Sequence, residues 1–205
     1  VMDEAEVAAV AEFCVDNDID VIADEIYAAL TYDGEHTSIA TMPNMRERTI
    51  VINGFSKAYA MTGLRLGYAM GPADAIDAMN RVHQYTMLSA PTTAQYAAIE
   101  ALRSCEESVT EMATAFNRRR RFVLSRFEEM GLDCFTAKGA FYAFPRCGGD
   151  DEAFAENLLA AEGVAVVPGS VFGPGGAGHL RISYATGMRD LKTAMNRIES
   201  FVADR

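Results

Sequence analysis

The sequence predicts an α/β fold, in which part of a large domain with a mostly parallel sheet in an α/β/α arrangement is followed by a small α+β domain. Three observations predict this fold. Over residues 1–73 a helical pattern alternates with short apolar runs that suit buried strands. Residues 74–130 are predicted to form long bridging helices, and residues 131–205 alternate short strands with helices. With 205 residues, half of them apolar, the chain is long enough to bury a substantial core.

The first domain is predicted to begin with a helix over residues 3–17. Apolar residues recur there at helical spacing after an acidic start that suits a helix N-terminus. The run 20–27 (DVIADEIY) is apolar and ends abruptly in charge, as expected of a strand buried on both faces of a parallel sheet. Two further β-rich runs, 49–56 and 64–71, flank the segment KAYAMTG. Strand, loop and strand therefore follow one another closely.

The long helices of residues 72–130 are interrupted at Ser89, Ala90 and Pro91. Gly131 stands where a helix C-cap is expected. Beyond it, the predicted strands are 132–138, 139–145, 164–169 and 179–185, and the predicted helices are 150–162 and 187–203. The glycine cluster 173–178 precedes a strand and not a helix, so we interpret it as a connecting loop rather than a phosphate loop.

The charge of the chain limits its partners. A net charge of −11 repels phosphates, which argues against nucleic acid and anionic membranes. No apolar run approaches the roughly 20 residues of a membrane span, and the start of the chain lacks the pattern of a signal peptide, so we expect a cytoplasmic location. Only Lys57, Lys138 and Lys192 are lysines. An acidic, lysine-poor surface suggests a salt-rich cytoplasm, with an ordinary acidic mesophile as the alternative.

The sequence predicts no metal site. The cysteines show no close ligand spacing and are expected to be reduced and mostly buried; they are Cys14, Cys105, Cys134 and Cys147. His36, His83 and His179 also lack metal-ligand spacing, and we expect surface or hydrogen-bonded histidines. The basic run 118–121 lies in an acidic helix, where it suits a solvated face with ion pairs better than a phosphate site.

The predicted chemistry centres on Lys57, within the segment SKAYAMTGLRLGY (56–68). Taken alone, this lysine could equally be a surface residue whose stem lies along the sheet. The segment resembles the lysine signature of the class I/II aminotransferases, which are fold-type I pyridoxal-phosphate enzymes. The resemblance implies that Lys57 holds pyridoxal 5'-phosphate covalently and that Arg65 binds the cofactor phosphate. A guanidinium suits that role because it can grip phosphate oxygens with two charge-assisted hydrogen bonds.

Two further segments resemble the same family. ADEIY (23–27) is similar to a signature that implies pairing of Asp24 with the pyridine nitrogen and a hydrogen bond from Tyr27 to the ring hydroxyl. A carboxylate there keeps the nitrogen protonated, so that the ring can accept electrons. The alternative role for Asp24 is a turn cap. HLRISYA (179–185) is similar to the segment whose arginine holds the substrate α-carboxylate, which implies that role for Arg181.

The resemblance implies an aminotransferase that passes an amino group from an amino acid to a 2-oxo acid, with Lys57 moving the proton. It also implies a homodimer, and it leaves aspartate, aromatic and alanine-type donors open. A lyase or decarboxylase on the same scaffold is an alternative, although Arg181 would stabilise the carboxylate that a decarboxylase must release. Many relatives carry a serine where this chain has Gly54, which puts one phosphate contact in doubt.

The family's N-terminal half is missing from this sequence. That half supplies a glycine-rich turn at the phosphate and an aromatic residue that stacks on the pyridine ring. The resemblance therefore also allows a different expectation: a truncated chain, inactive alone, or a partner subunit that needs the complementary half.

Overall fold

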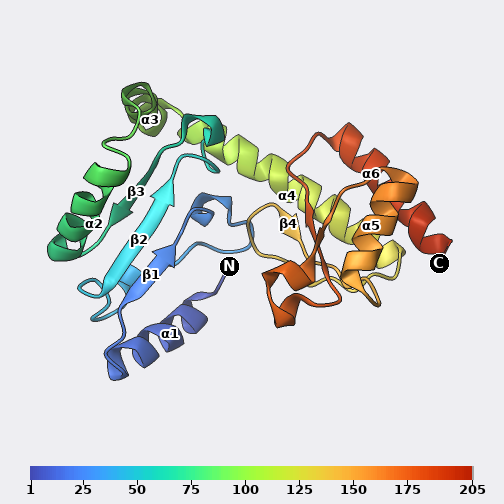
Figure 1. The fold of residues 1–205 in the computed structure, drawn as a ribbon, viewed down its shortest axis with the longest axis horizontal. Coiled ribbons are helices and arrows are strands. Elements are labelled where there is room, and N and C mark those ends of the chain that lie inside the picture. Colours follow the sequence, from blue (N-terminus) through green and yellow to red (C-terminus); the bar gives the residue numbers. More distant parts are fainter. Residues whose placement is uncertain (205) are drawn as a thin grey trace. The chain divides into compact units, whose positions relative to one another are not determined.

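A computed structural model describes residues 1–204, and the chain divides into two compact units. The first unit spans Val1–Ala113 and the second begins at Thr114. The first unit contains three strands, β1 (Val21–Asp24), β2 (Thr49–Gly54) and β3 (Gly67–Met70), and β2 lies between the other two (Figure 1). The predicted strands at 20–27, 49–56 and 64–71 are thereby confirmed, each shortened at one or both ends.

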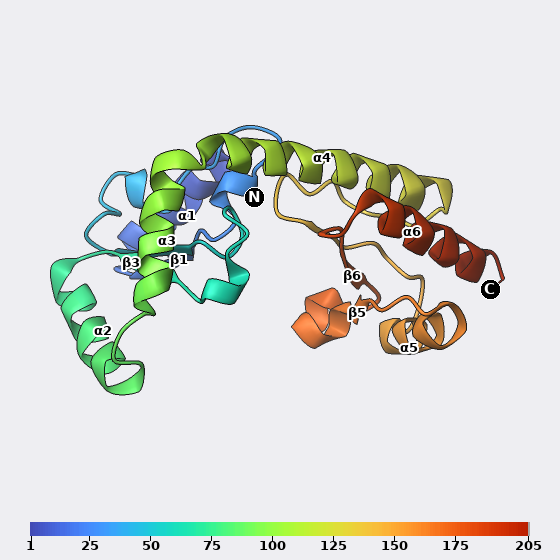
Figure 2. The same ribbon diagram turned by 90° about the horizontal axis from the view of Figure 1, so that it is seen from above.

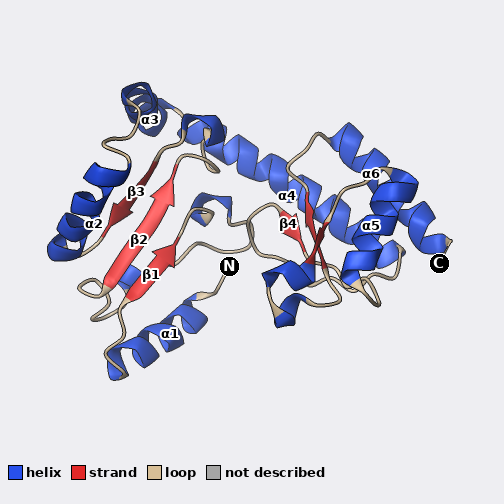
Figure 3. Ribbon diagram, in the orientation of Figure 1, coloured by secondary structure: helices blue, strands red, loops and turns tan. Residues whose placement is uncertain are grey.

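The sheet of the first unit is mixed. β1 and β2 are parallel, with Val21 opposite Thr49, whereas β2 and β3 are antiparallel, with Gly54 opposite Gly67 (Figure 3). Within the described residues, the expected mostly parallel pattern thus holds for one of two pairings. The cause is the connection 55–66, which folds into turns and one short 3-10 helix. A parallel return needs a crossover, usually an α-helix, and this connection contains none.

Helix α1 (Glu4–Asp16) confirms the first predicted helix, and its start is fixed by a capping box. The backbone N–H of Glu6 donates to Asp3 Oδ1 at 3.0 Å, and the N–H of Asp3 donates to Glu6 Oε2 at 2.8 Å. Both donors would otherwise lack partners at the helix start. The buried face of α1 presents Ala11 and Cys14 to the buried side chain of Met45, which forms a small core for this unit.

Three more helices follow β3, as predicted: α2 (Ala73–Thr86), α3 (Thr92–Ser104) and α4 (Glu106–Glu129). The break between α2 and α3 includes Pro91, the N-cap of α3. At the end of α4, the N–H of Leu132 donates to the carbonyl of Phe127 and that of Gly131 to the carbonyl of Glu128. This is a Schellman arrangement, and it needs the positive φ of 70° that Gly131 adopts.

The second unit has a small antiparallel sheet in the order β4 (Tyr142–Ala143), β6 (Leu180–Ser183), β5 (Val167–Pro168). Its helices are α5 (Asp151–Glu162), α6 (Met188–Ala203) and the later part of α4. The strand predicted over 132–138 was wrong, because no strand forms there. The carbonyl of Ala137 instead accepts a 2.6 Å hydrogen bond from Arg120 Nη1 on α4.

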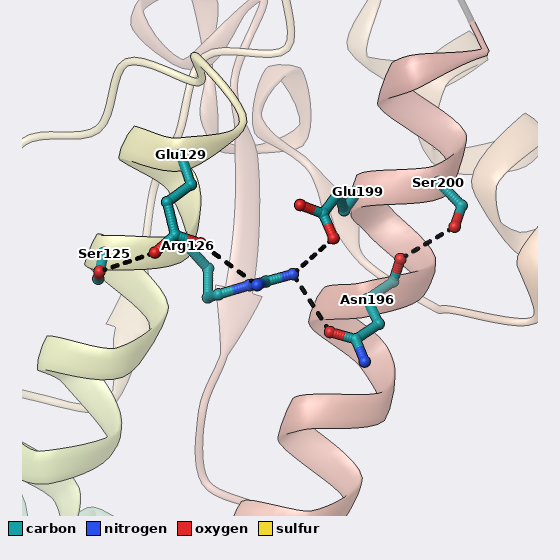
Figure 4. Close-up of polar contacts among 6 residues, drawn as sticks. All are labelled: Ser125, Arg126, Glu129, Asn196, Glu199 and Ser200. Atoms are coloured by element: carbon teal, nitrogen blue, oxygen red, sulfur yellow. Dashed lines mark hydrogen bonds and ion pairs between the residues drawn. The ribbon is translucent and has the colours of Figure 1, made fainter.

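Helices α4 and α6 lie side by side within the second unit (Figures 1 and 2). Arg126 of α4 joins them, because its Nη2 lies 2.8 Å from Glu199 Oε2 and 3.2 Å from Asn196 Oδ1 (Figure 4). The same guanidinium also pairs with Glu129 on its own helix, at 3.2 Å. The core beneath is apolar and includes Val123, Phe127, Phe154, Leu158, Leu180, Leu191, Met195 and Ile198.

All four cysteines are free thiols, as expected; Cys14 and Cys147 are buried, and Cys105 and Cys134 are half-buried. Within residues 1–204, no helix combines the length and the apolar character that crossing a bilayer requires.

Candidate functional site

Four predicted site residues belong to the first unit, and two strand ends bring their segments together. β1 and β2 run in the same direction, so their carboxyl ends meet at one edge of the sheet (Figure 1). Asp24 is the last residue of β1 and lies opposite Ile52 of β2. Tyr27 follows in a turn after β1, and Lys57 follows in a turn after β2. Open α/β sheets bind their ligands at this kind of edge.

Lys57 and Tyr27 lie close together at this edge. The Nζ atom of Lys57 stands over the Tyr27 ring, 5.7 Å from its centroid, and both side chains are half-buried. This is within the range of a cation–π contact when the amine is charged. A primary amine next to a phenol, on a partly shielded sheet edge, offers both a nucleophile and a hydroxyl donor to an aromatic aldehyde.

Asp24 also serves its own turn. Its Oδ1 accepts a 3.1 Å hydrogen bond from the backbone N–H of Ile26, which is the turn-cap role expected as the alternative. The residue is exposed, so the carboxylate remains open to solvent at the end of the strand. Since a carboxylate has several acceptor positions, this cap leaves capacity for a second partner.

The loop 55–65 places Arg65 relative to Lys57. The hydroxyl of Thr62 donates to the carbonyl of Ser56 at 2.7 Å, and Arg65 Nη1 donates to the carbonyl of Thr62 at 2.8 Å. Arg65 adopts a left-handed backbone conformation, with φ of 54°, and its side chain is exposed. Its other N–H groups have no hydrogen-bond partner within the described first unit. A free guanidinium edge is suited to an anion such as a phosphate.

Packing explains why glycine stands at position 54. A Cβ there would come within 2.9 Å of Gly67 Cα and 3.0 Å of the Leu66 carbonyl oxygen, because β3 approaches β2 closely at this point. Both obstacles are backbone atoms, which cannot move aside as a side-chain tip can. Position 54, where the resemblance led us to expect a serine, therefore coincides with a tight strand pairing.

The sequence patterns did not identify an aromatic cluster beside this edge. The centroid of the Phe55 ring lies 5.4 Å from the centroid of the Tyr59 ring and 5.8 Å from that of the Tyr68 ring. Burial raises the pKa of the Tyr68 hydroxyl, and the nearby Tyr59 and Glu25 raise it further. His36 Nε2 lies 3.2 Å from Glu25 Oε2. The available signal in the sequence was the presence of two tyrosines, Tyr59 and Tyr68, within 11 residues of Lys57.

Arg181 belongs to β6 in the second unit, where two aromatic rings approach it. Its Cζ lies 4.9 Å from the centroid of the Tyr142 ring and 4.7 Å from that of the Phe172 ring. Within the described part of this unit, residues 114–204, no hydrogen bond or ion pair engages the guanidinium. Its N–H donors are therefore available to an anionic ligand.

The loop that carries Phe172 is anchored by the buried carboxylate of Asp151. Asp151 Oδ2 accepts from the N–H of Ser170 at 2.7 Å, and Oδ1 accepts from the N–H of Gly178 at 3.2 Å. The hydrogen bond from the Ser170 backbone, more than any other contact, lowers the pKa of Asp151 from 3.8 to about 2. One carboxylate thus fixes both ends of the loop 170–178.

We expect acid to loosen this loop. A carboxyl whose folded pKa is depressed stabilises the fold above its unfolded pKa, and that contribution is lost as the pH falls from about 3.8 towards about 2. Urea unfolding of the wild type and Asp151→Asn should differ most above about pH 5 and converge near about pH 2. Glu152→Gln, an exposed neighbour on the same helix turn, is the control. A difference that does not change with pH would contradict the role of the ionised carboxylate.

Residues 1–204 contain no group of three or more histidine, cysteine or carboxylate side chains arranged to hold a metal ion.

Comparisons with known proteins identify the family of the chain. Residues 1–198 match the family model described as aminotransferase class I and II. The chain is 51% identical to the putative aminotransferase YugH of Bacillus subtilis, over 98% of this chain and 53% of that protein. It is 43% identical to an aspartate aminotransferase of Pyrococcus abyssi, over all of this chain and 54% of that protein.

A solved structure gives the same result. The crystal structure of an aromatic aminotransferase from Pyrococcus horikoshii superposes with a TM-score of 0.97 at 43% identity, covering all of this chain and 57% of that one. The chain spans about half the length of the curated relatives that it matches.

Proposed function

Because the chain belongs to the class I and II aminotransferase family, whose members depend on pyridoxal phosphate, we propose that it forms the cofactor lysine site of an aminotransferase. The reaction is the transfer of an amino group from an amino acid to a 2-oxo acid. The observation that carries this proposal is the position of Lys57 Nζ over the Tyr27 ring, at the sheet edge where Asp24 ends β1.

The residues at this edge fit the cofactor. Lys57 would supply the amine that holds the cofactor aldehyde covalently, and Tyr27 would supply a hydroxyl for the ring oxygen. Asp24, exposed at the strand end, would pair with the pyridine nitrogen, and Arg65, with donors to spare, would hold the phosphate. The bound cofactor supplies an electron sink for the pair of electrons left when the substrate loses its α-proton.

Proton transfer and substrate binding would be carried out by side chains of this chain. The Lys57 amine, when free, would take up the α-proton of the substrate as a general base and donate it again as a general acid. Arg181 would bind the α-carboxylate of the substrate and so orient the bond to that proton. Relatives named for aspartate and for aromatic amino acids are about equally similar to this chain, so both donor classes fit.

The proposal extends to domain organisation and assembly. We propose that residues 1–73 belong to the cofactor-binding large domain, whose sheet is mostly parallel in the complete fold. Residues 74–130 would then be bridging helices, and residues 131–205 the small domain. We also propose that the protein is a homodimer, because the family that the chain belongs to implies one.

Labelling of lysines tests the proposed site. The chain would be mixed with pyridoxal phosphate, reduced with borohydride and digested, and the modified peptide located by mass spectrometry. The label is expected on Lys57 and not on Lys138 or Lys192, which are exposed and serve as internal controls. Lys57→Arg keeps the charge and should abolish the label, whereas Lys138→Arg and Lys192→Arg should retain it. Equal labelling of all three lysines would contradict the proposal.

A second candidate, a chain that acts only with a complementary polypeptide, is favoured by one observation. Large apolar side chains are exposed in the first unit, including Ile22 of β1 at 70% and Tyr85 of α2 at 92%. A complementary polypeptide that packs against β1 and α2 would cover these side chains and remove their apolar surface from water. Selective labelling of Lys57 in a chain that sediments alone as one compact species would rule this candidate out.

A further inference from the structure

We propose that Tyr142 and Phe172, here called the ring pair, position Arg181 so that its N–H edge faces a carboxylate ligand. The inference rests on the proposed role of Arg181 and deepens it. Both rings are within 5 Å of the guanidinium carbon, well inside the range of about 6 Å over which a ring attracts a cation. The ring pair would act through Arg181 and not on the substrate directly.

Ring contacts are suited to positioning Arg181 because they leave its N–H donors unoccupied. A guanidinium has five N–H donors in its plane, and attraction to an aromatic ring consumes none of them. A salt bridge to an acidic residue would hold the side chain equally well but would occupy the donors. Arg181 has no such acid within residues 114–204, so the ring pair restrains a flexible side chain while its fork stays available to a carboxylate.

The two rings come from different elements. Tyr142 is fixed by the sheet: it lies opposite Ser183 in the β4–β6 ladder, which places it diagonally beside Arg181 on the same face. Phe172 ends the short helix Gly169–Phe172 in the loop that Asp151 anchors at Ser170 and Gly178. The ring of Phe144 packs edge-on against the ring of Phe172, with 6.4 Å between the two centroids.

Because Tyr142 lies in a strand and Phe172 in a loop, we expect Phe172 to be the ring that can change position. Tyr142 is half-buried in a strand, whereas Phe172 is 52% exposed in a loop. The position of Arg181 is therefore tied to the order of the loop 170–178, and disturbance of that loop should weaken carboxylate binding without any change in Arg181 itself.

Nuclear magnetic resonance of arginine side chains tests the ring pair without cofactor or turnover. The Nε–Hε signal of Arg181 would be assigned by its loss in Arg181→Lys and followed during titration with propionate, a carboxylate without an amino group. In the wild type, the signal should be displaced by the ring currents and should shift saturably. Tyr142→Leu and Phe172→Leu should each reduce the ring-current displacement and weaken propionate binding about 2–5-fold, the range expected for one exposed cation–π contact.

Matched variants separate positioning from general damage. Tyr142→Phe and Phe172→Tyr keep the rings and should restore wild-type affinity, and Phe135→Leu removes an exposed ring elsewhere in the same unit and should change nothing. If the leucine variants bind propionate as tightly as the wild type does, the ring pair is overturned while Arg181 keeps its role. If the wild-type Arg181 signal does not respond to propionate, the proposed carboxylate role itself fails.

Discussion

Replacing Lys57 with alanine is expected to reduce amino-group transfer by about 10²–10⁴-fold, the usual contribution of a positioned acid–base group. The loss should appear in kcat, because the amine acts on the proton in transit more than on substrate binding. The measurement is the rate of transfer from L-aspartate and from L-phenylalanine to 2-oxoglutarate. Lys138→Ala and Lys192→Ala, both at exposed positions, should retain the wild-type rate.

A small amine provides the decisive control for that prediction. If Lys57 acts through its amino group, added methylamine should restore part of the lost rate in Lys57→Ala, and restoration should rise with the amine's concentration. A structural role would not respond to a soluble amine. A wild-type chain that transfers no amino group from any donor would contradict activity in this chain, and the second candidate function would then be preferred.

Replacing Gly176 with alanine is expected to destabilise the second unit by about 1–3 kcal/mol or more, because a new Cβ would collide with the carbonyl oxygen of Gly169. The clash is mutual, since a Cβ at Gly169 would collide with the carbonyl oxygen of Gly176. Both obstacles are backbone atoms, so the loop itself would have to shift to make room. Urea unfolding at neutral pH measures the change in the free energy of unfolding.

Gly175 offers a matched control one residue away. A Cβ at that position meets nothing within 4 Å, so Gly175→Ala should be neutral or stabilise the unit by about 0.4–1 kcal/mol through the unfolded state. Equal unfolding midpoints for the two alanine variants would show that the loop yields easily. Because Phe172 belongs to the same loop, Gly176→Ala should also weaken propionate binding at Arg181, whereas Gly175→Ala should not.

Local chemistry made the helices predictable. Acidic residues at the start of α1 include Asp3 and Glu6, which form its capping box, and Gly131 ends α4 with the positive φ that glycine tolerates. These signals act within a few residues, so they are readable from the sequence. The strands were found by their apolar runs, but the direction of β3 was not. That direction depends on how the loop 55–66 folds, which no periodicity encodes.

The failed strand at 132–138 has a similar cause. Its residues suit a strand, yet the Ala137 carbonyl bonds to Arg120, seventeen positions earlier in the chain. Partners in a sheet are chosen by tertiary structure, which overrides local preference. The motifs identified Lys57, Asp24, Tyr27, Arg65 and Arg181 as candidates, but not the neighbours of Arg181. Tyr142 reaches it through strand register and Phe172 through a loop, and both relationships require coordinates.

The close pairing of Gly54 with Gly67 limits which residues position 54 can accept. A serine at position 54 would have its Cβ 2.9 Å from the Gly67 Cα, so a single substitution cannot introduce a hydroxyl there without displacing β3. A serine grafted at position 54 therefore has to be combined with a shift of the Leu66–Gly67 backbone, and the two positions act as one unit in any redesign of this sheet.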